Sequence, residues 1–302
     1  MRNKKLSLLG LAACLLFANA CAAADMTVSP KTVLVGSTPC GDAIRSIFSI
    51  APGKPVDFIR WELTLNDVGK KTFDLNINFG EAQPNTSGFK NGGEKMAFAG
   101  KYSAADTKNG QPPRLKLQID SKVLTLVRLN EDLYHVLTDD DKLMVGNGGW
   151  SYTLSARDAR EKRSGVLPVR AISPPEDTGP ETIFEGRTPC QDFAKQYNLQ
   201  RGSECFKLKW KITLYRDAST NEPTTYALES TLNRPEAVKG TWKIVRGIQY
   251  DPVAVIYRLD LEKTNETLSF LVGDENVLFF LDKDARLFVG DENFSYTLNR
   301  RK

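Results

Sequence analysis

The sequence predicts an all-β protein made of two tandem antiparallel meander barrels, each of about eight strands, after an N-terminal signal segment. Three observations predict this fold. An ordered internal repeat divides the chain, apolar residues alternate with polar ones inside each repeat, and short turn sequences separate successive apolar runs. No sustained helical period follows residue 24, so layers of long helices are not expected.

The repeat is the strongest of these signals. Residues 36–40 (GSTPC) recur as 186–190 (GRTPC), and residues 60–65 (RWELTL) recur as 209–214 (KWKITL). The endings also match, because LMVG and WSYTL within 143–154 recur as LFVG and FSYTL within 287–298. The offset drifts only from 190 − 40 = 150 to 287 − 143 = 144, as changes in loop length would produce. We therefore expect one domain over 33–156 and a second over 183–300, each with its own core.

Inside each copy the apolar period is two, as expected for strands with one buried face. The clearest runs have apolar residues at Ile59, Trp61, Leu63 and Leu65, and at Phe206, Leu208, Trp210, Ile212 and Leu214. Counting such runs predicts strands in the first copy near 57–66, 72–79, 96–104, 114–120, 123–129, 132–138, 142–146 and 149–155. The second copy's strands are expected near 205–216, 223–232, 237–247, 252–260, 266–272, 276–281, 285–289 and 293–299.

Strands joined in order by short turns form a meander, and eight of them can close and remove the exposed sheet edges. Residues 41–50 and 190–198 are expected to form a short helix or cap after each repeated cysteine. The Thr-Pro-Cys element before each one is expected to end a loop and plug one end of its barrel. Between the copies, residues 157–182 hold four prolines and many charges, which predicts a partly extended linker.

The first 24 residues have the pattern of a signal segment. A basic start at residues 1–5 precedes an apolar run at 6–17 that is too short to span a bilayer. Cleavage after Ala20 or Ala24 would release a secreted or periplasmic protein. Residues 18–21 (ANAC) also resemble a bacterial lipobox. Residues 11–14 (LAAC) match that motif better, but cleavage there would leave a very short apolar core, which favours lipidation of Cys21. We expect an envelope lipoprotein anchored through Cys21, with plain secretion as the alternative.

Export would place the remaining cysteines in an oxidising compartment, where a structural disulfide is expected. Cys190 and Cys205 are the best candidates for a disulfide, because the polar loop between them lets its ends meet. Cys40 has no partner in its own copy, and we expect it to be buried, with a disulfide to Cys21 or a reactive thiol as alternatives. Thiolates are soft ligands for Cu(I) or Zn, so Cys40 and Cys190 are candidate metal ligands. One thiolate per domain is nevertheless a poor metal site.

Charge and motifs argue against nucleic-acid binding and against catalysis. Without residues 1–24 the chain has 38 basic and 37 acidic residues, a net charge of 38 − 37 = +1. There is no phosphate-binding loop, dinucleotide fingerprint or His-rich metal spacing. The one histidine, His135, lies on a predicted strand and has no counterpart in the second copy, where Val277 or Leu278 falls at the matching position. No triad motif supports a catalytic role for it. The acids at 139–141 are expected to be turn residues.

Both copies resemble the N-terminal barrel of the NlpE-like copper-resistance lipoproteins. The resemblance is carried by GSTPC and GRTPC, each followed by a Trp-bearing strand, and by the Ser-Tyr-Thr-Leu endings. It implies lipocalin-like barrels, an outer-membrane location facing the periplasm or the cell surface, and a part in envelope stress, copper homeostasis or surface adhesion. The family's Cys-x-x-Cys is incomplete here, since its second positions hold Ala43 and Phe193.

These observations favour a non-enzymatic binding or sensing module whose partner is another envelope protein or the membrane surface. A lipocalin-like carrier of a small apolar ligand is the first alternative, although bulky residues such as Trp61, Phe79 and Trp210 indicate filled barrels. A thiol-based metal buffer is the second. The residues themselves imply no cofactor, and copper is implied by the family resemblance only.

Overall fold

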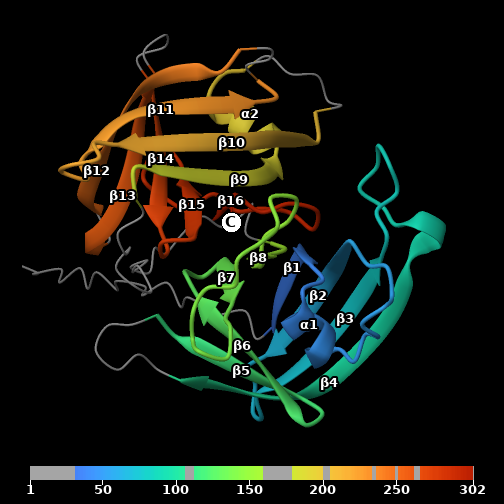
Figure 1. Ribbon diagram of the computed structural model, residues 1–302. Helices are drawn as coiled ribbons and strands as arrows, with labels where there is room; N and C mark the ends of the chain where they lie inside the picture. Colours follow the sequence, from blue (N-terminus) through green and yellow to red (C-terminus); the bar gives the residue numbers. More distant parts are fainter. Residues whose placement is uncertain are drawn as a thin grey trace, which may run out of the picture.

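The computed structural model describes residues 31–105, 112–158, 179–199, 205–232, 236–248, 251–261 and 266–301. It confirms the predicted fold, with two closed antiparallel barrels of eight strands each (Figure 1). The signal segment, with the predicted lipidation site Cys21, and most of the predicted linker at 157–182 lie outside the described residues.

The first barrel pairs its strands in chain order and closes between the last strand and the first. A short helix α1 (Asp42–Ile47) follows the first strand, and a 3-10 turn η1 (Lys90–Gly92) precedes the fourth. The strands are β1 (Lys31–Pro39), β2 (Phe58–Asn66), β3 (Thr72–Gly80), β4 (Glu94–Ala105), β5 (Arg114–Ile119), β6 (Lys122–Arg128), β7 (Leu133–Val136) and β8 (Thr153–Ala156).

The second barrel repeats this topology, closing between its last strand and its first. Helix α2 (Gln191–Gln196) takes the place of α1. The strands are β9 (Glu181–Pro189), β10 (Lys207–Arg216), β11 (Pro223–Ser230), β12 (Val238–Ile248), β13 (Asp251–Leu261), β14 (Glu266–Val272), β15 (Val277–Leu281) and β16 (Thr297–Arg300).

Two strands in each copy differ from the prediction. The segments that hold GSTPC and GRTPC end the strands β1 and β9 rather than loops, because their Gly and Pro residues give a turn-like signal within an otherwise paired strand. Conversely, 142–146 and 285–289 are not strands and make single bridges, at Leu143 and Leu287. Their apolar residues form short continuous runs for another reason. Leu143 and Leu287 pack into a core between the barrels, whereas Met144 and Phe288 pack into the core of their own barrel.

The repeated glycine of these motifs has a steric cause. A Cβ on Gly36 would lie 2.9 Å from the carbonyl oxygen of Thr153 in β8, and a Cβ on Gly186 would lie 2.7 Å from that of Thr297 in β16. Real Cβ atoms do not approach backbone oxygens so closely. Glycine therefore permits the close approach of the first and last strands at the closure of each barrel.

Side chains fill both barrels. Trp61 and Trp210 are buried, and their indole N–H groups donate to the hydroxyl oxygens of Thr38 and Thr188 at 2.8 and 2.9 Å. An aromatic ring from each helical segment closes the core. Phe48, directly after α1, meets Trp61 edge-on with ring centroids 5.0 Å apart, and Phe193 of α2 meets Trp210 in the same way at 5.0 Å. The Thr-Pro-Cys element thus supplies the hydrogen-bond acceptor for the central tryptophan of its barrel.

A third apolar core joins the two barrels, with strand residues from β6 and β7 of the first and from β13, β14 and β15 of the second (Figure 1). Its buried members come from both halves of the chain. They are Val127, Leu129, Leu133, Leu137 and Leu143 on one side, and Ala254, Ile256, Leu271, Val277, Phe279, Leu281 and Leu287 on the other. This shared buried core packs the two barrels against each other as one unit, in contrast to independent domains joined only by a linker.

The polar contacts in this interface are related by an approximate two-fold axis. Equivalent threonines touch, with Thr153 Oγ1 2.9 Å from Thr297 Oγ1. The contact between Gly146 and Asn299 is matched by its counterpart, in which the Gly290 N–H donates to Ser155 Oγ. Each contact therefore recurs with the roles of the two copies exchanged, as in an isologous dimer.

The register also corrects the repeat alignment at the one histidine. His135 pairs with Thr153, and Phe279 pairs with Thr297, so the counterpart of His135 is Phe279 and not Val277 or Leu278. The two equivalent rings touch edge-on across the interface, with centroids 5.6 Å apart.

We predict that Gly36→Ala lowers the free energy of unfolding by about 1–3 kcal/mol, because the added methyl group must push β1 away from β8. Urea unfolding followed by circular dichroism measures this change. Gly53→Ala is the matched control, since a Cβ there meets nothing within 4 Å. An equal effect of both substitutions would show that closure of the barrel does not require the glycine.

Candidate functional site

A cleft of about 170 Å³ lies at the junction of the barrels and takes residues from both. We call it the inter-barrel cleft. The first barrel contributes Phe58, Arg60, the loop at 82–88 and Trp150, and the second contributes Arg187, Lys207, Asn293 and Phe294. Two of these pairs are equivalent in the repeat, Phe58 with Lys207 and Trp150 with Phe294. The cleft therefore lies close to the approximate two-fold axis, yet its two walls differ chemically.

The wall from the first barrel is aromatic. Phe58 stacks on Phe89 with ring centroids 4.1 Å apart, and on Trp150 with centroids 4.6 Å apart. The Arg60 guanidinium lies 5.5 Å from the ring centroid of Phe89 and donates to Asn293 Oδ1 of the second barrel at 2.7 Å. This bond holds the aromatic wall against the opposite one.

The wall from the second barrel is cationic. The Arg187 guanidinium lies 5.4 Å from the ring centroid of Trp150, and the Lys207 ammonium lies 5.8 Å from that of Phe294. Burial lowers the pKa of Arg187. Burial is also the main reason why the pKa of Lys207 is lowered, and the positive charges of Arg187 and Lys209 lower it further. These shifts show that two positive charges are partly withdrawn from water and repel each other.

Among the residues that the structure describes, neither cation has an anionic partner. The side chains of Arg187 and Lys207 make no hydrogen bond or ion pair there, and they lie over aromatic rings. Burial also lowers the pKa of Arg60, but the nearby negative charges of Glu292 and Asp291 partly oppose this effect. Chemically, the cleft offers two uncompensated positive charges beside an apolar surface.

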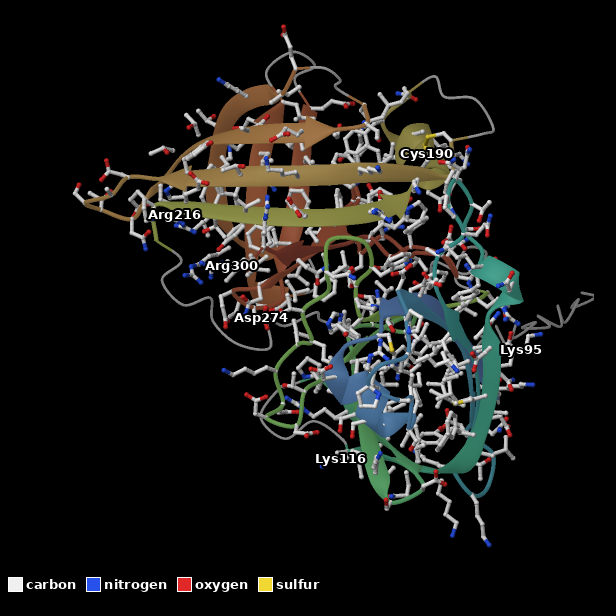
Figure 2. The ribbon with its side chains drawn as sticks, turned by 45° about the vertical axis from the view of Figure 1, so that its right-hand side comes forward. Lys95, Lys116, Cys190, Arg216, Asp274 and Arg300 are labelled. Atoms are coloured by element: carbon white, nitrogen blue, oxygen red, sulfur yellow. A yellow bond between two sulfur atoms is a disulfide. The ribbon has the colours of Figure 1, made fainter. Side chains whose placement is uncertain are left out.

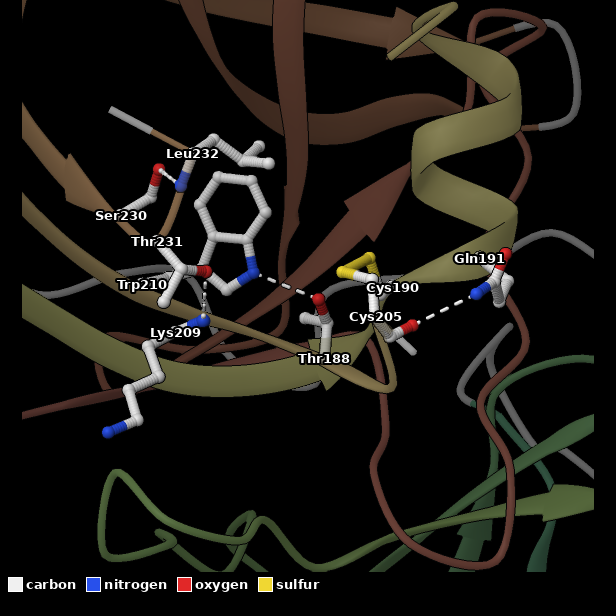
Figure 3. Close-up of a disulfide and its surroundings, with 9 residues drawn as sticks. All are labelled: Thr188, Cys190, Gln191, Cys205, Lys209, Trp210, Ser230, Thr231 and Leu232. Atoms are coloured by element: carbon white, nitrogen blue, oxygen red, sulfur yellow. Dashed lines mark hydrogen bonds between the residues drawn. A yellow bond between two sulfur atoms is a disulfide. The ribbon is translucent and has the colours of Figure 1, made fainter. Parts of the chain in front are cut away.

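The predicted disulfide partners are joined, since Cys190 and Cys205 form a disulfide with Cα atoms 5.7 Å apart (Figure 3). The bond fastens the segment after α2 to the end of β9, and the Gln191 amide donates to the Cys205 carbonyl oxygen at 3.0 Å. It lies beside the Trp210–Thr188 hydrogen bond in the second barrel.

The two candidate metal ligands are not brought together. Cys40 is a free, partly buried thiol packed against the core of the first barrel, whereas Cys190 belongs to the core of the second. Burial raises the pKa of Cys40, and the disulfide leaves Cys190 without a thiolate. Among the described residues, no group of three or more His, Cys, Asp or Glu side chains is placed to hold a metal ion.

His135 has a structural role in the interface. It is fully buried, its Nε2–H donates to the carbonyl oxygen of Met144, and its Nδ1 accepts from the Thr153 hydroxyl, both at 2.9 Å. Burial lowers the pKa of His135 to about 4, so the ring is neutral near pH 7. A neutral ring sealed between two barrels has no access to a substrate.

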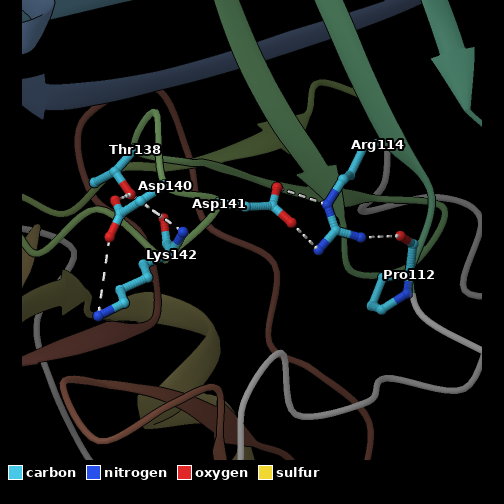
Figure 4. A network of polar contacts seen from close by, with 6 residues as sticks. All are labelled: Pro112, Arg114, Thr138, Asp140, Asp141 and Lys142. Atoms are coloured by element: carbon cyan, nitrogen blue, oxygen red, sulfur yellow. Dashed lines mark hydrogen bonds and ion pairs between the residues drawn. The ribbon is translucent and has the colours of Figure 1, made fainter.

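The acidic turn at 139–141 is held by local contacts (Figure 4). Asp140 accepts from the Thr138 hydroxyl, and Arg114 donates through Nε to Asp141 at 2.7 Å. Arg114 also reaches the Pro112 carbonyl oxygen. These bonds explain the acids without a bound cation.

The cleft could not be predicted from the sequence, because the residues that line it lie far apart in the chain. The one available signal is chemical divergence next to the repeated motifs, where Ser37 is replaced by Arg187 and Phe58 by Lys207. Whether such a change creates a site depends on how the two barrels dock, which the repeat itself does not specify.

The fold and the cleft define a class, that of a two-barrel β protein with a mixed aromatic and cationic site at the barrel junction. Comparisons of the chain with protein-family models, with curated proteins and with solved structures found no match. Over the ranges that the structure covers, no helix has the length and apolar character needed to cross a membrane.

One ionisable group in the interface differs from its counterpart in the repeat. Asp274 lies on the side of the second barrel that faces the first (Figure 2), and it accepts the backbone N–H of Asn276 at 2.8 Å and that of Leu143. Burial raises the pKa of Asp274 to about 6. The equivalent position in the first barrel is Asn130, which accepts the N–H groups of Asp132 and Leu133 without a charge.

We predict that Asp274→Asn makes the change in unfolding free energy between pH 7.5 and pH 5 more negative than it is in the unaltered protein. The folded state binds a proton at Asp274 more tightly than the unfolded state, so this group adds stability as the pH falls through about 6 towards 3.8. His135 acts in the opposite sense, because its pKa is lowered from 6.5 to about 4 in the folded state.

Urea unfolding at both pH values measures the two contributions. The change in unfolding free energy on acidification should be more negative for Asp274→Asn than for the unaltered protein, and more positive for His135→Phe. Identical pH responses in all three proteins would contradict the assignment of these groups to the interface.

Proposed function

We propose that this protein is a non-enzymatic binding and sensing module of the bacterial envelope, of the NlpE-like type and anchored through Cys21. The observation that carries the proposal is the inter-barrel cleft, where Arg187 and Lys207 lie beside a stack of aromatic rings and have no anionic partner among the described residues. Unpaired, partly buried charges are costly in a folded protein, and a bound ligand of opposite charge relieves that cost.

An envelope location is supported by two independent features. The first 24 residues have the pattern of an export signal, and the Cys190–Cys205 disulfide suits an oxidising compartment. The assignment to envelope stress or copper homeostasis rests on the resemblance of both copies to NlpE-like barrels.

Binding at the junction is favoured over the two alternatives. An apolar carrier would need space inside a barrel, but Trp61, Phe73 and Phe79 are buried in one interior, and Trp210 and Phe270 in the other. A two-thiol metal buffer would need Cys190 as a thiolate, whereas its sulfur is bonded to Cys205. The cleft remains as the place where another envelope protein, the membrane surface or a small ligand contacts the chain.

Purification from the native cell envelope, followed by native and denaturing mass spectrometry, tests this proposal. We expect acyl mass on Cys21, and a ligand or cross-linked envelope partner that is retained by the unaltered protein and lost by Trp150→Ala. Tyr215→Ala is the matched control, because this partly exposed aromatic residue does not line the cleft.

Two results would contradict the proposal. An unlipidated chain that starts near Asp25 and carries a small apolar molecule would favour the soluble carrier. Equal retention of the ligand by Trp150→Ala and the control would place the binding site away from the cleft. Circular dichroism of each variant separates loss of the ligand from loss of the fold.

A further inference from the structure

We infer that the inter-barrel cleft binds a phosphate monoester, with the phosphate on Arg187 and Lys207 and the attached carbon group against the aromatic wall. This inference rests on the proposed function, because it assigns a ligand class to the same cleft.

The charge at the cleft sets the charge of the ligand. The charge of Arg60 is partly compensated, since its guanidinium donates to Asn293 Oδ1 and lies near Glu292 and Asp291. Arg187 and Lys207 have no such compensation among the residues that the structure describes. Two positive charges therefore remain, and a phosphate monoester carries about −1.5 to −2 charges near pH 7. A carboxylate would balance only one of them.

The donor types also suit phosphate. The planar guanidinium of Arg187 can donate two parallel N–H bonds to phosphate oxygens, and the Lys207 ammonium adds a point charge with three donors. Trp150, Phe58 and Phe294 line the same space. Their apolar surface lowers the local dielectric and so strengthens an ion pair formed inside the cleft.

The volume limits the size of the ligand. The cleft has about 170 Å³, which is comparable with the ~150 Å³ engineered cavity that holds benzene. It therefore accepts a phosphate with a small carbon group but not a long acyl chain. The ligand is either a small soluble phosphate monoester or a lipid headgroup of the phosphatidic acid type whose chains stay outside.

The repeat shows that these cations are specific to one copy. The counterpart of Arg187 is Ser37, which donates through Oγ to the Glu292 carbonyl oxygen, and the counterpart of Lys207 is Phe58, which stacks on Trp150. The first copy thus satisfies its positions with a hydrogen bond and a ring stack. The second copy places charge there without a partner in the described protein.

Calorimetric titration of the full chain with phenyl phosphate, inorganic phosphate and benzoate tests the inference. We expect phenyl phosphate to bind, benzoate to bind at least tenfold more weakly, and the double variant Arg187→Met/Lys207→Met to lose at least tenfold in affinity for phenyl phosphate. Methionine keeps the apolar stem of each side chain and removes its charge.

Lys95→Met/Lys116→Met is the matched control, because it removes the same charge from exposed strand positions on the first barrel (Figure 2). Flotation with phosphatidylcholine vesicles, with and without phosphatidic acid, distinguishes the two sources of the phosphate. Binding to phenyl phosphate alone indicates a soluble ligand, whereas retention on the phosphatidic acid vesicles indicates a lipid headgroup. Either result supports the inference if the double variant abolishes it.

The inference fails if no phosphate probe binds, if the double variant binds as tightly as the control, or if benzoate binds more tightly than phenyl phosphate. Such a failure is separable from a failure of the proposed function. A ligand from the envelope that is lost in Trp150→Ala would still support binding at the cleft and would point to a different ligand class.

Discussion

The apolar core shared by the two barrels is the contact on which the other features depend. It buries one side of each barrel, and the paired Thr153 and Thr297 hydroxyls lie close to its approximate two-fold axis. Without this docking, Arg187 would not reach Trp150, Arg60 would not reach Asn293, and the cleft would not exist. Stability and the candidate site therefore arise from the same buried surface.

Much of the fold could be predicted from the sequence, because closing a barrel imposes a period of two on its strands and duplication repeats the pattern. Duplication also placed the short helices, because the segments after Cys40 and Cys190 occupy the same position in the two copies. The strands β1 and β9 were not, since Gly36 and Pro39 resemble turn residues unless the close approach to β8 is known. Residues 142–146 are apolar partly because the partner barrel buries Leu143, and a pattern within one copy cannot reveal a neighbour.

The candidate site was beyond prediction for a related reason. Its charge comes from replacements at Ser37 and Phe58 of the first copy by Arg187 and Lys207 of the second. On an isolated barrel these would be ordinary surface cations. Docking places them against the rings of the other barrel and withdraws them from water, which converts two unremarkable substitutions into an electrostatically unsatisfied cleft.

The exchange of equivalent contacts across the interface has a further consequence for how such a protein can arise. A contact in which each half presents the same surface to the other is one that a single-barrel chain could form with an identical copy, at a strength limited by its concentration. Fusing the two copies in one polypeptide makes the association intramolecular and independent of dilution. Fusion also frees the halves to differ, so that one position, His135 in one barrel and Phe279 in the other, no longer needs the same side chain twice.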